Sequence, residues 1–177
     1  MGHARAYVVH RTADAAEAHA CARRFRELLT EPEDTLLVEA LVSDPERLRR
    51  VAAAVPGAWF EDARQRTYDP WGEPGEVSFP VWVCAEEAPR EAELPFLRAV
   101  GEDPASVVWR GTWPGPDGAG HRDGVQVTFH SDDVELERAA PAHTVFLHVH
   151  SRCPVERVRE LAALGGCEVL EGPRLGL

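Results

Sequence analysis

The segment 143–153 concentrates side chains that can bind a metal or act as a nucleophile. Its first eight residues are expected to form a strand, and side chains two positions apart on a strand point to the same face of a sheet. His148 and His150 have that spacing, so two imidazoles would lie side by side and could bind zinc or another transition metal. His130 ends an earlier predicted strand and would complete the ligand set if the two strands are neighbours.

Cys153 offers a second kind of chemistry. It precedes Pro154 at the expected start of a helix, where the helix dipole favours the nucleophilic thiolate. Asp132 and Asp133 follow His130 directly, and either carboxylate could orient an imidazole or act as a general base. These residues point to a metal-dependent or thiol-dependent enzyme of the hydrolase type.

The same residues also have a plainer interpretation. His-x-His pairs occur on ordinary half-exposed strands, and zinc sites built only from protein ligands usually show tighter spacing. The sequence contains no H-E-x-x-H or C-x-x-C motif, no Gly-x-Ser-x-Gly elbow and no Gly-Lys-Ser/Thr phosphate loop. The missing motifs favour a protein that binds a partner, and such a protein would need no cofactor.

Trp71 is the aromatic residue best placed to contact a partner. It lies in the loop 69–75, whose proline, glycine and aspartate residues are typical of turns, so its side chain is expected to be exposed. The strand expected at 77–85 follows, and Pro80 restricts that strand to a sheet edge or a bulge. An exposed tryptophan beside an edge strand is typical of a protein-binding surface.

Charge limits the partners further. The 177 residues carry 19 arginines, no lysine and 30 acidic residues, for a net charge of −11. This charge disfavours nucleic acid and anionic membranes as partners, because both are bound mainly through basic residues. No run of about 18 apolar residues could span a membrane, and the first 20 residues lack the apolar centre of a secretory signal. Because the four cysteines are also widely spaced, we expect reduced thiols and a cytoplasmic location.

Hydrophobic periodicity predicts alternating strands and helices. Strands are expected at 6–10, 35–42, 58–61, 77–85, 106–113, 124–130, 143–150 and 167–171. Helices are expected from an N-cap at Thr12 or Asp14 to about residue 29, from an N-cap at Ser43 to Pro56, and at 89–100, 132–139 and 154–164. A hairpin loop is expected at 114–120. This alternation predicts an α/β fold, an α+β sandwich in which helices pack on a mixed sheet.

Two segments, 43–53 and 151–163, share the pattern E-R-x-R-x-x-A-A. Each follows an expected strand, and each is ended by glycine before a short strand. The pattern indicates an internal repeat and allows two tandem ferredoxin-like units, 1–86 and 87–177. Chance similarity and one compact domain are the alternatives, because alanine, arginine and glutamate fill any amphipathic helix in this composition.

The sequence thus favours a small acidic α/β protein that acts as a non-enzymatic binding or regulatory module through a protein partner. Its edge strands also allow a homodimer. The alternative is a hydrolase that depends on a metal at His148 and His150 or on the thiol of Cys153.

Overall fold

The computed structural model describes residues 4–72, 75–115 and 123–177. They form strands and helices in the order β1 (Arg5–Thr12), α1 (Ala15–Leu28), β2 (Thr35–Val42), α2 (Pro45–Ala54), β3 (Trp59–Glu61), β4 (Val81–Pro89), the short 3-10 helix η1 (Arg90–Ala92), α3 (Glu93–Val100), β5 (Ala105–Arg110), β6 (Gly124–Phe129), β7 (His143–Val149), α4 (Val155–Leu164) and β8 (Glu171–Leu175). None of these described helices is long and apolar enough to cross a membrane. The alternation of strands and helices is thus confirmed.

The eight strands form one open sheet in the order β3-β4-β2-β5-β6-β7-β1-β8. A mixed sheet was expected, but every pairing between described strands is antiparallel. The connections explain this difference. The helices α2, α3 and α4 each join two strands that are separated by one position in the sheet, and an oppositely directed strand fills the gap.

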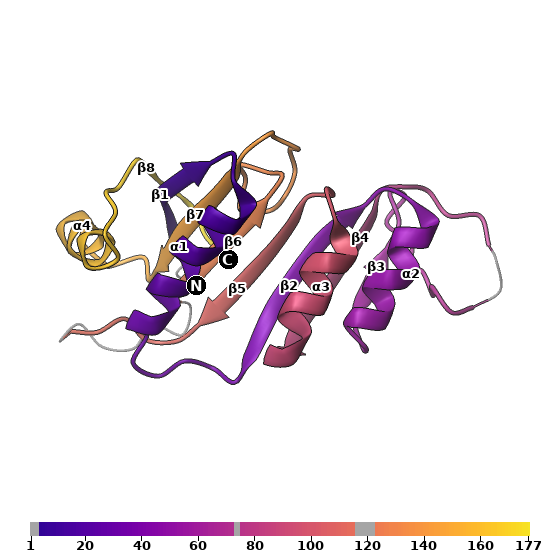
Figure 1. The fold of residues 1–177 in the computed structure, drawn as a ribbon, viewed down its shortest axis with the longest axis horizontal. Coiled ribbons are helices and arrows are strands. Elements are labelled where there is room, and N and C mark those ends of the chain that lie inside the picture. The colour runs from indigo at the N-terminus through magenta and orange to yellow at the C-terminus, as the bar shows by residue number, and fades with distance from the viewer. Residues whose placement is uncertain (1–3, 73–74, 116–122) are drawn as a thin grey trace.

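The helices cover one face of the sheet, as Figure 1 shows for α1, α2 and α3. One core cluster contains buried side chains from all four α-helices, among them Phe25, Val51, Phe96 and Leu161. The opposite face, called the helix-free face below, carries two smaller clusters, one around Phe146 and one around Leu37 with Cys84 and Val108. The core therefore lies between the sheet and the helices.

The helix α2 is capped one residue later than expected. Asp44, not Ser43, is the N-cap, and its carboxylate accepts the backbone N–H groups of Glu46 and Arg47 at 3.0 Å. The hydroxyl of Ser43 instead donates to Asp103 at 2.8 Å. Both residue types can cap a helix, but the hydroxyl of Ser43 is already bonded to Asp103, so Asp44 caps α2.

The prediction of a helix at 132–139 is wrong, because this segment forms turns and bends. Ser131 donates its hydroxyl to the carbonyl of Arg138 at 2.7 Å, and such side-chain bonds to the backbone compete with a helix. Leu136 has a φ of 59°, which a right-handed helix cannot contain. The segment instead packs Val134 against Phe146 on the helix-free face.

Two strands lie further along the chain than expected. β4 begins only after Pro80 and lies inside the sheet between β3 and β2, so it is not an edge strand. β8 begins at Glu171 because the backbone N–H of Cys167 still bonds the carbonyl of Ala162 at the end of α4. The hairpin loop expected at 114–120 falls mostly outside the described residues.

Gly165 sets how closely the end of α4 approaches α1. A Cβ atom at this position would overlap the ring of Phe25, which is fully buried in the core. The carbonyl of Gly165 also accepts a hydrogen bond from Nε of Arg24 on α1. The absence of a side chain at Gly165 therefore lets the two helices meet.

We predict that Gly165→Ala lowers the free energy of unfolding by roughly 1–3 kcal/mol, because the added methyl group displaces the Phe25 ring. Urea denaturation measures the change. Leu164→Ala alters a side chain that is 59% exposed on the same helical turn and should change stability by no more than about 0.5 kcal/mol. Equal effects of the two substitutions would contradict the packing argument.

Candidate functional site

A row of directly paired residues crosses the helix-free face from its β3 edge. Trp59 on β3 pairs with Cys84 on β4, Cys84 with Glu39 on β2, and Glu39 with Ser106 on β5. Paired residues share a face of a sheet. Val83, one position from Cys84, belongs to the core under the helices, so the row points to the other side.

Glu39 is a carboxylate in the middle of an otherwise apolar strand. Burial raises its pKa to about 7, and the negative charge of Glu135 adds to this effect. A hydrogen bond from Trp82 and the positive charge of Arg110 act in the opposite direction but do not cancel it. Glu39 is therefore partly protonated near neutral pH and responds to any cation that comes close.

An open groove of about 540 Å³ lies beside Glu39 at the β3 and β4 end of the helix-free face. Trp59, Trp82, Glu86 and Glu87 are among the residues that line it, and Trp59 is 52% exposed. Cys84 also lines the groove, but burial raises the pKa of its thiol to about 12, so the thiol stays protonated. Indole faces and carboxylates together are the groups that attract organic cations.

His148 lies on the same face, at the other half of the sheet, and is 2% exposed. Its Nδ1 atom accepts the backbone N–H of Leu177 at 3.4 Å, and its Nε2 atom lies 2.8 Å from Oε1 of Gln126. Burial lowers the pKa of His148 to about 4, and the positive charge of Arg110 contributes. The ring is therefore neutral, and hydrogen bonds occupy both of its nitrogens.

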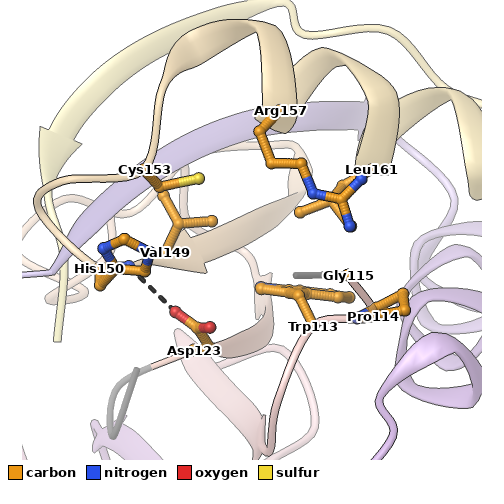
Figure 2. Close-up of a pocket in the computed structure, with 9 residues that line it drawn as sticks. All are labelled: Trp113, Pro114, Gly115, Asp123, Val149, His150, Cys153, Arg157 and Leu161. Atoms are coloured by element: carbon orange, nitrogen blue, oxygen red, sulfur yellow. Dashed lines mark hydrogen bonds between the residues drawn. The ribbon is translucent and has the colours of Figure 1, made fainter. Parts of the chain in front are cut away.

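The structure brings His150 and Cys153 to a different place. They line a small pocket together with Asp123, Trp113 and Arg157, and Figure 2 shows Arg157 reaching toward the Trp113 indole. The backbone N–H of His150 donates to Asp123 at 3.0 Å. The space measures about 20 Å³, which is enough for one water molecule. Cys153 itself is 5% exposed.

The remaining predicted residues lie elsewhere. The His130 ring meets His143 edge-on, with centroids 4.6 Å apart, at the opposite end of β6 from the strand pair of His148. Asp132 forms an ion pair with Arg138 at 3.3 Å, and Asp133 accepts a backbone N–H within the same turn. Within the described residues, the ligand atoms of the three predicted histidines form no cluster.

Trp71 is 65% exposed and lies in the connection between β3 and β4. Its backbone N–H donates to the side chain of Asp69 at 2.9 Å, which fixes the turn. Figure 1 shows that this connection extends past the β3 edge of the sheet. Trp71 and Trp59 therefore belong to the same end of the molecule.

Sequence reasoning missed the groove residues and Glu39. A signal for Glu39 was present, because it is the single charged residue in the strand Thr35–Val42. Trp59 and Trp82 gave no comparable signal, since they come together only through the pairing of β3 with β4.

We predict that Glu39→Gln makes the protein more stable at pH 8 than the wild type by about 2 kcal/mol, with little difference near pH 4. Burial raises the pKa of Glu39 from its ordinary value of 4.5 to about 7 in the folded chain. The folded state therefore holds this proton more tightly, and its contribution to stability is lost as pH rises through that window.

Urea denaturation across this pH range measures the difference. Glu87→Gln, which removes an exposed carboxylate from β4, controls for the loss of one charge. A Glu39→Gln effect that does not change with pH would show that Glu39 is not a perturbed carboxyl group.

Comparisons of this chain with models of protein families, with curated proteins and with solved structures found no match. The chemistry of the described residues is therefore the basis for a function. Among the surfaces described above, the groove at the β3 edge combines exposure, aromatic rings and negative charge.

Proposed function

We propose that the protein is a non-enzymatic binding or regulatory module that holds a cationic side chain of a protein partner in the groove at the β3 edge. One observation carries the proposal: Trp59 and Trp82 stand beside Glu86 and Glu87 in an open groove. An arginine or lysine side chain would stack on an indole and pair with a carboxylate.

The charge of the whole chain supports a cationic partner. The net charge of −11 attracts basic segments over long distances and speeds their encounter with the surface. The same charges disfavour a homodimer formed through this groove, because two acidic surfaces would face each other.

Glu39 gives the proposed binding a dependence on pH. It lies between Cys84 and Ser106 in the paired row, beside the groove, and its carboxyl group is partly protonated near neutral pH. A bound cation would stabilise the carboxylate and so favour release of the proton. Binding should therefore strengthen as pH rises through about 7.

We also propose that the sheet consists of two ferredoxin-like units. The unit β2-α2-β3-β4-α3-β5 would be inserted between α1 and β6 of a second unit, which contains β1, α1, β6, β7, α4 and β8. The strand order supports this division. It reads β3-β4-β2-β5 from one edge and β8-β1-β7-β6 from the other, so β2 matches β7 and β4 matches β1. The shared E-R-x-R-x-x-A-A pattern then falls on the matched helices α2 and α4. This division differs from the one at residue 86 that the sequence suggested.

A thiol-dependent enzyme remains the alternative. It is favoured by the cavity that gathers Cys153, His150 and Asp123, which are residue types used in thiol catalysis. The size of the cavity, about one water molecule, favours the binding function over this alternative. The cytoplasmic location stays a prediction.

We predict that arginine-containing peptides bind the full chain more tightly than matched peptides with glutamine in place of arginine. Trp59→Ala should weaken this binding about tenfold or more, as expected for an aromatic residue at the centre of an interface. Quenching of tryptophan fluorescence, supported by calorimetry, measures the affinity.

The control is Leu175→Ala, which truncates a 61% exposed side chain on β8 at the opposite edge of the sheet. It should leave the affinity unchanged. Equal binding of the arginine and glutamine peptides, or equal losses in both variants, would exclude the groove as the site.

A separate prediction concerns the residues chosen from the sequence. Trp71→Ala should weaken binding of the same peptides, because Trp71 is exposed in the connection that follows β3. The double variant His148→Ala/His150→Ala should bind normally once circular dichroism shows that it is folded. Loss of binding in a folded double variant would count against the binding module and in favour of the enzyme.

A further inference from the structure

Three soft-metal ligands meet on the helix-covered side of the sheet, away from the groove. They are His10 of β1, Cys21 of α1 and Cys167 from the connection between α4 and β8. Their ligand atoms all lie within 4.8 Å of one another, the only such group of three among the described residues. Cys21 and Cys167 are 146 positions apart in the chain, so only the fold brings them together.

The distance between the two sulfur atoms suits a shared zinc ion. Sγ of Cys21 and Sγ of Cys167 are 3.7 Å apart. Two sulfurs bound tetrahedrally to zinc at about 2.3 Å would be separated by about 3.8 Å. A disulfide would require about 2.05 Å, so the observed spacing fits a bridging ion better than a covalent bond.

Glu17 lies beside the cluster and contacts His10. Its Oε1 atom lies 3.1 Å from Nε2 of His10, and Glu17 precedes Cys21 by four residues, on the same face of α1. The hydroxyl of Thr12 donates to the other oxygen, Oε2, at 2.8 Å. Such a bond orients the carboxylate and keeps Oε1 beside the His10 ring.

The imidazole of His10 is the third member of the cluster. Its Nε2 atom is buried and lies 3.1 Å from Oε1 of Glu17, but this contact lacks hydrogen-bond geometry. An imidazole nitrogen in that state is a ready metal ligand. The His10 side chain is 23% exposed and Cys167 is half-buried, so an ion can enter from solvent.

We propose that His10, Cys21 and Cys167 bind a zinc ion tetrahedrally, with a water molecule as the fourth ligand. Two thiolates and an imidazole are ligands that zinc accepts, and three protein ligands with one water are a common zinc coordination. Binding transfers the two thiol protons to solvent, and no oxidation takes place. The ion would tie β1 and α1 to the segment that follows α4, and so link the two ends of the chain.

The test uses the full chain without a tag, reduced and freed of metal, and titrated with Co²⁺ and then Zn²⁺. The expected result is one Co²⁺ per chain, with thiolate-to-metal charge-transfer absorption that Zn²⁺ removes. Cys167→Ala and His10→Ala should each weaken binding by at least about tenfold, whereas Cys153→Ala, a change to a thiol outside the cluster, should bind normally.

Alkylation followed by peptide mass spectrometry gives a second measurement on the unaltered chain. Zn²⁺ should protect Cys21 and Cys167 and leave the rates at Cys84 and Cys153 unchanged. This decides the matter even if a variant fails to fold. Absence of stoichiometric Co²⁺ binding, unchanged binding in folded Cys167→Ala and His10→Ala, or uniform alkylation with and without Zn²⁺ would overturn the site.

Discussion

Packing of all four α-helices against one face of an antiparallel sheet is the constraint on which the rest of the structure depends. An eight-stranded sheet has two faces, and the second must be covered by other segments or remain exposed. Around Phe146 it is covered by Val134 and Leu177. Around Trp59 it stays open, and there the groove forms. The proposed binding site thus lies where no other segment covers the helix-free face.

Burial acts in opposite directions on Glu39 and His148, which share this face. It raises the pKa of Glu39 and lowers that of His148, because a low dielectric disfavours the charged form of each. The positive charge of Arg110 acts on both groups, while Glu86 and Glu87 at the rim are exposed carboxylates. A cation that binds at the rim would pair with these exposed carboxylates and favour the ionised form of Glu39.

Local patterns predicted the elements whose signals are local. The strand β7 and the helix α4 lie within a residue of their expected bounds, because apolar periodicity and the Gly165-Gly166 stop are properties of short windows. The helix predicted at 132–139 does not form, because Ser131 donates a hydrogen bond to the backbone of Arg138. Hydrophobic periodicity does not detect such a competing bond. The neighbours of each strand could not be predicted, because β1 lies beside β7 across more than 130 residues of chain.

The same distinction between local and long-range signals applies to the candidate site. Exposure of Trp71 followed from its turn composition, and the structure confirms it. The burial of His148 could not be inferred, because it depends on Gln126 from another strand and on Leu177 at the far end of the sequence. The groove depends on the register that sets Trp59 opposite Cys84, and no short window of sequence contains that register.

The most direct test of a cation-binding groove uses the indole N–H signals of the five tryptophans in a nitrogen-15 spectrum. The probe is a blocked arginine, added at rising concentration to the full chain. The groove account predicts that the signals of Trp59 and Trp82 move in a saturable way. The signals of Trp109 and Trp113, both buried, should stay in place. Unmoved signals at Trp59 and Trp82, or equal movement of all five, would contradict it.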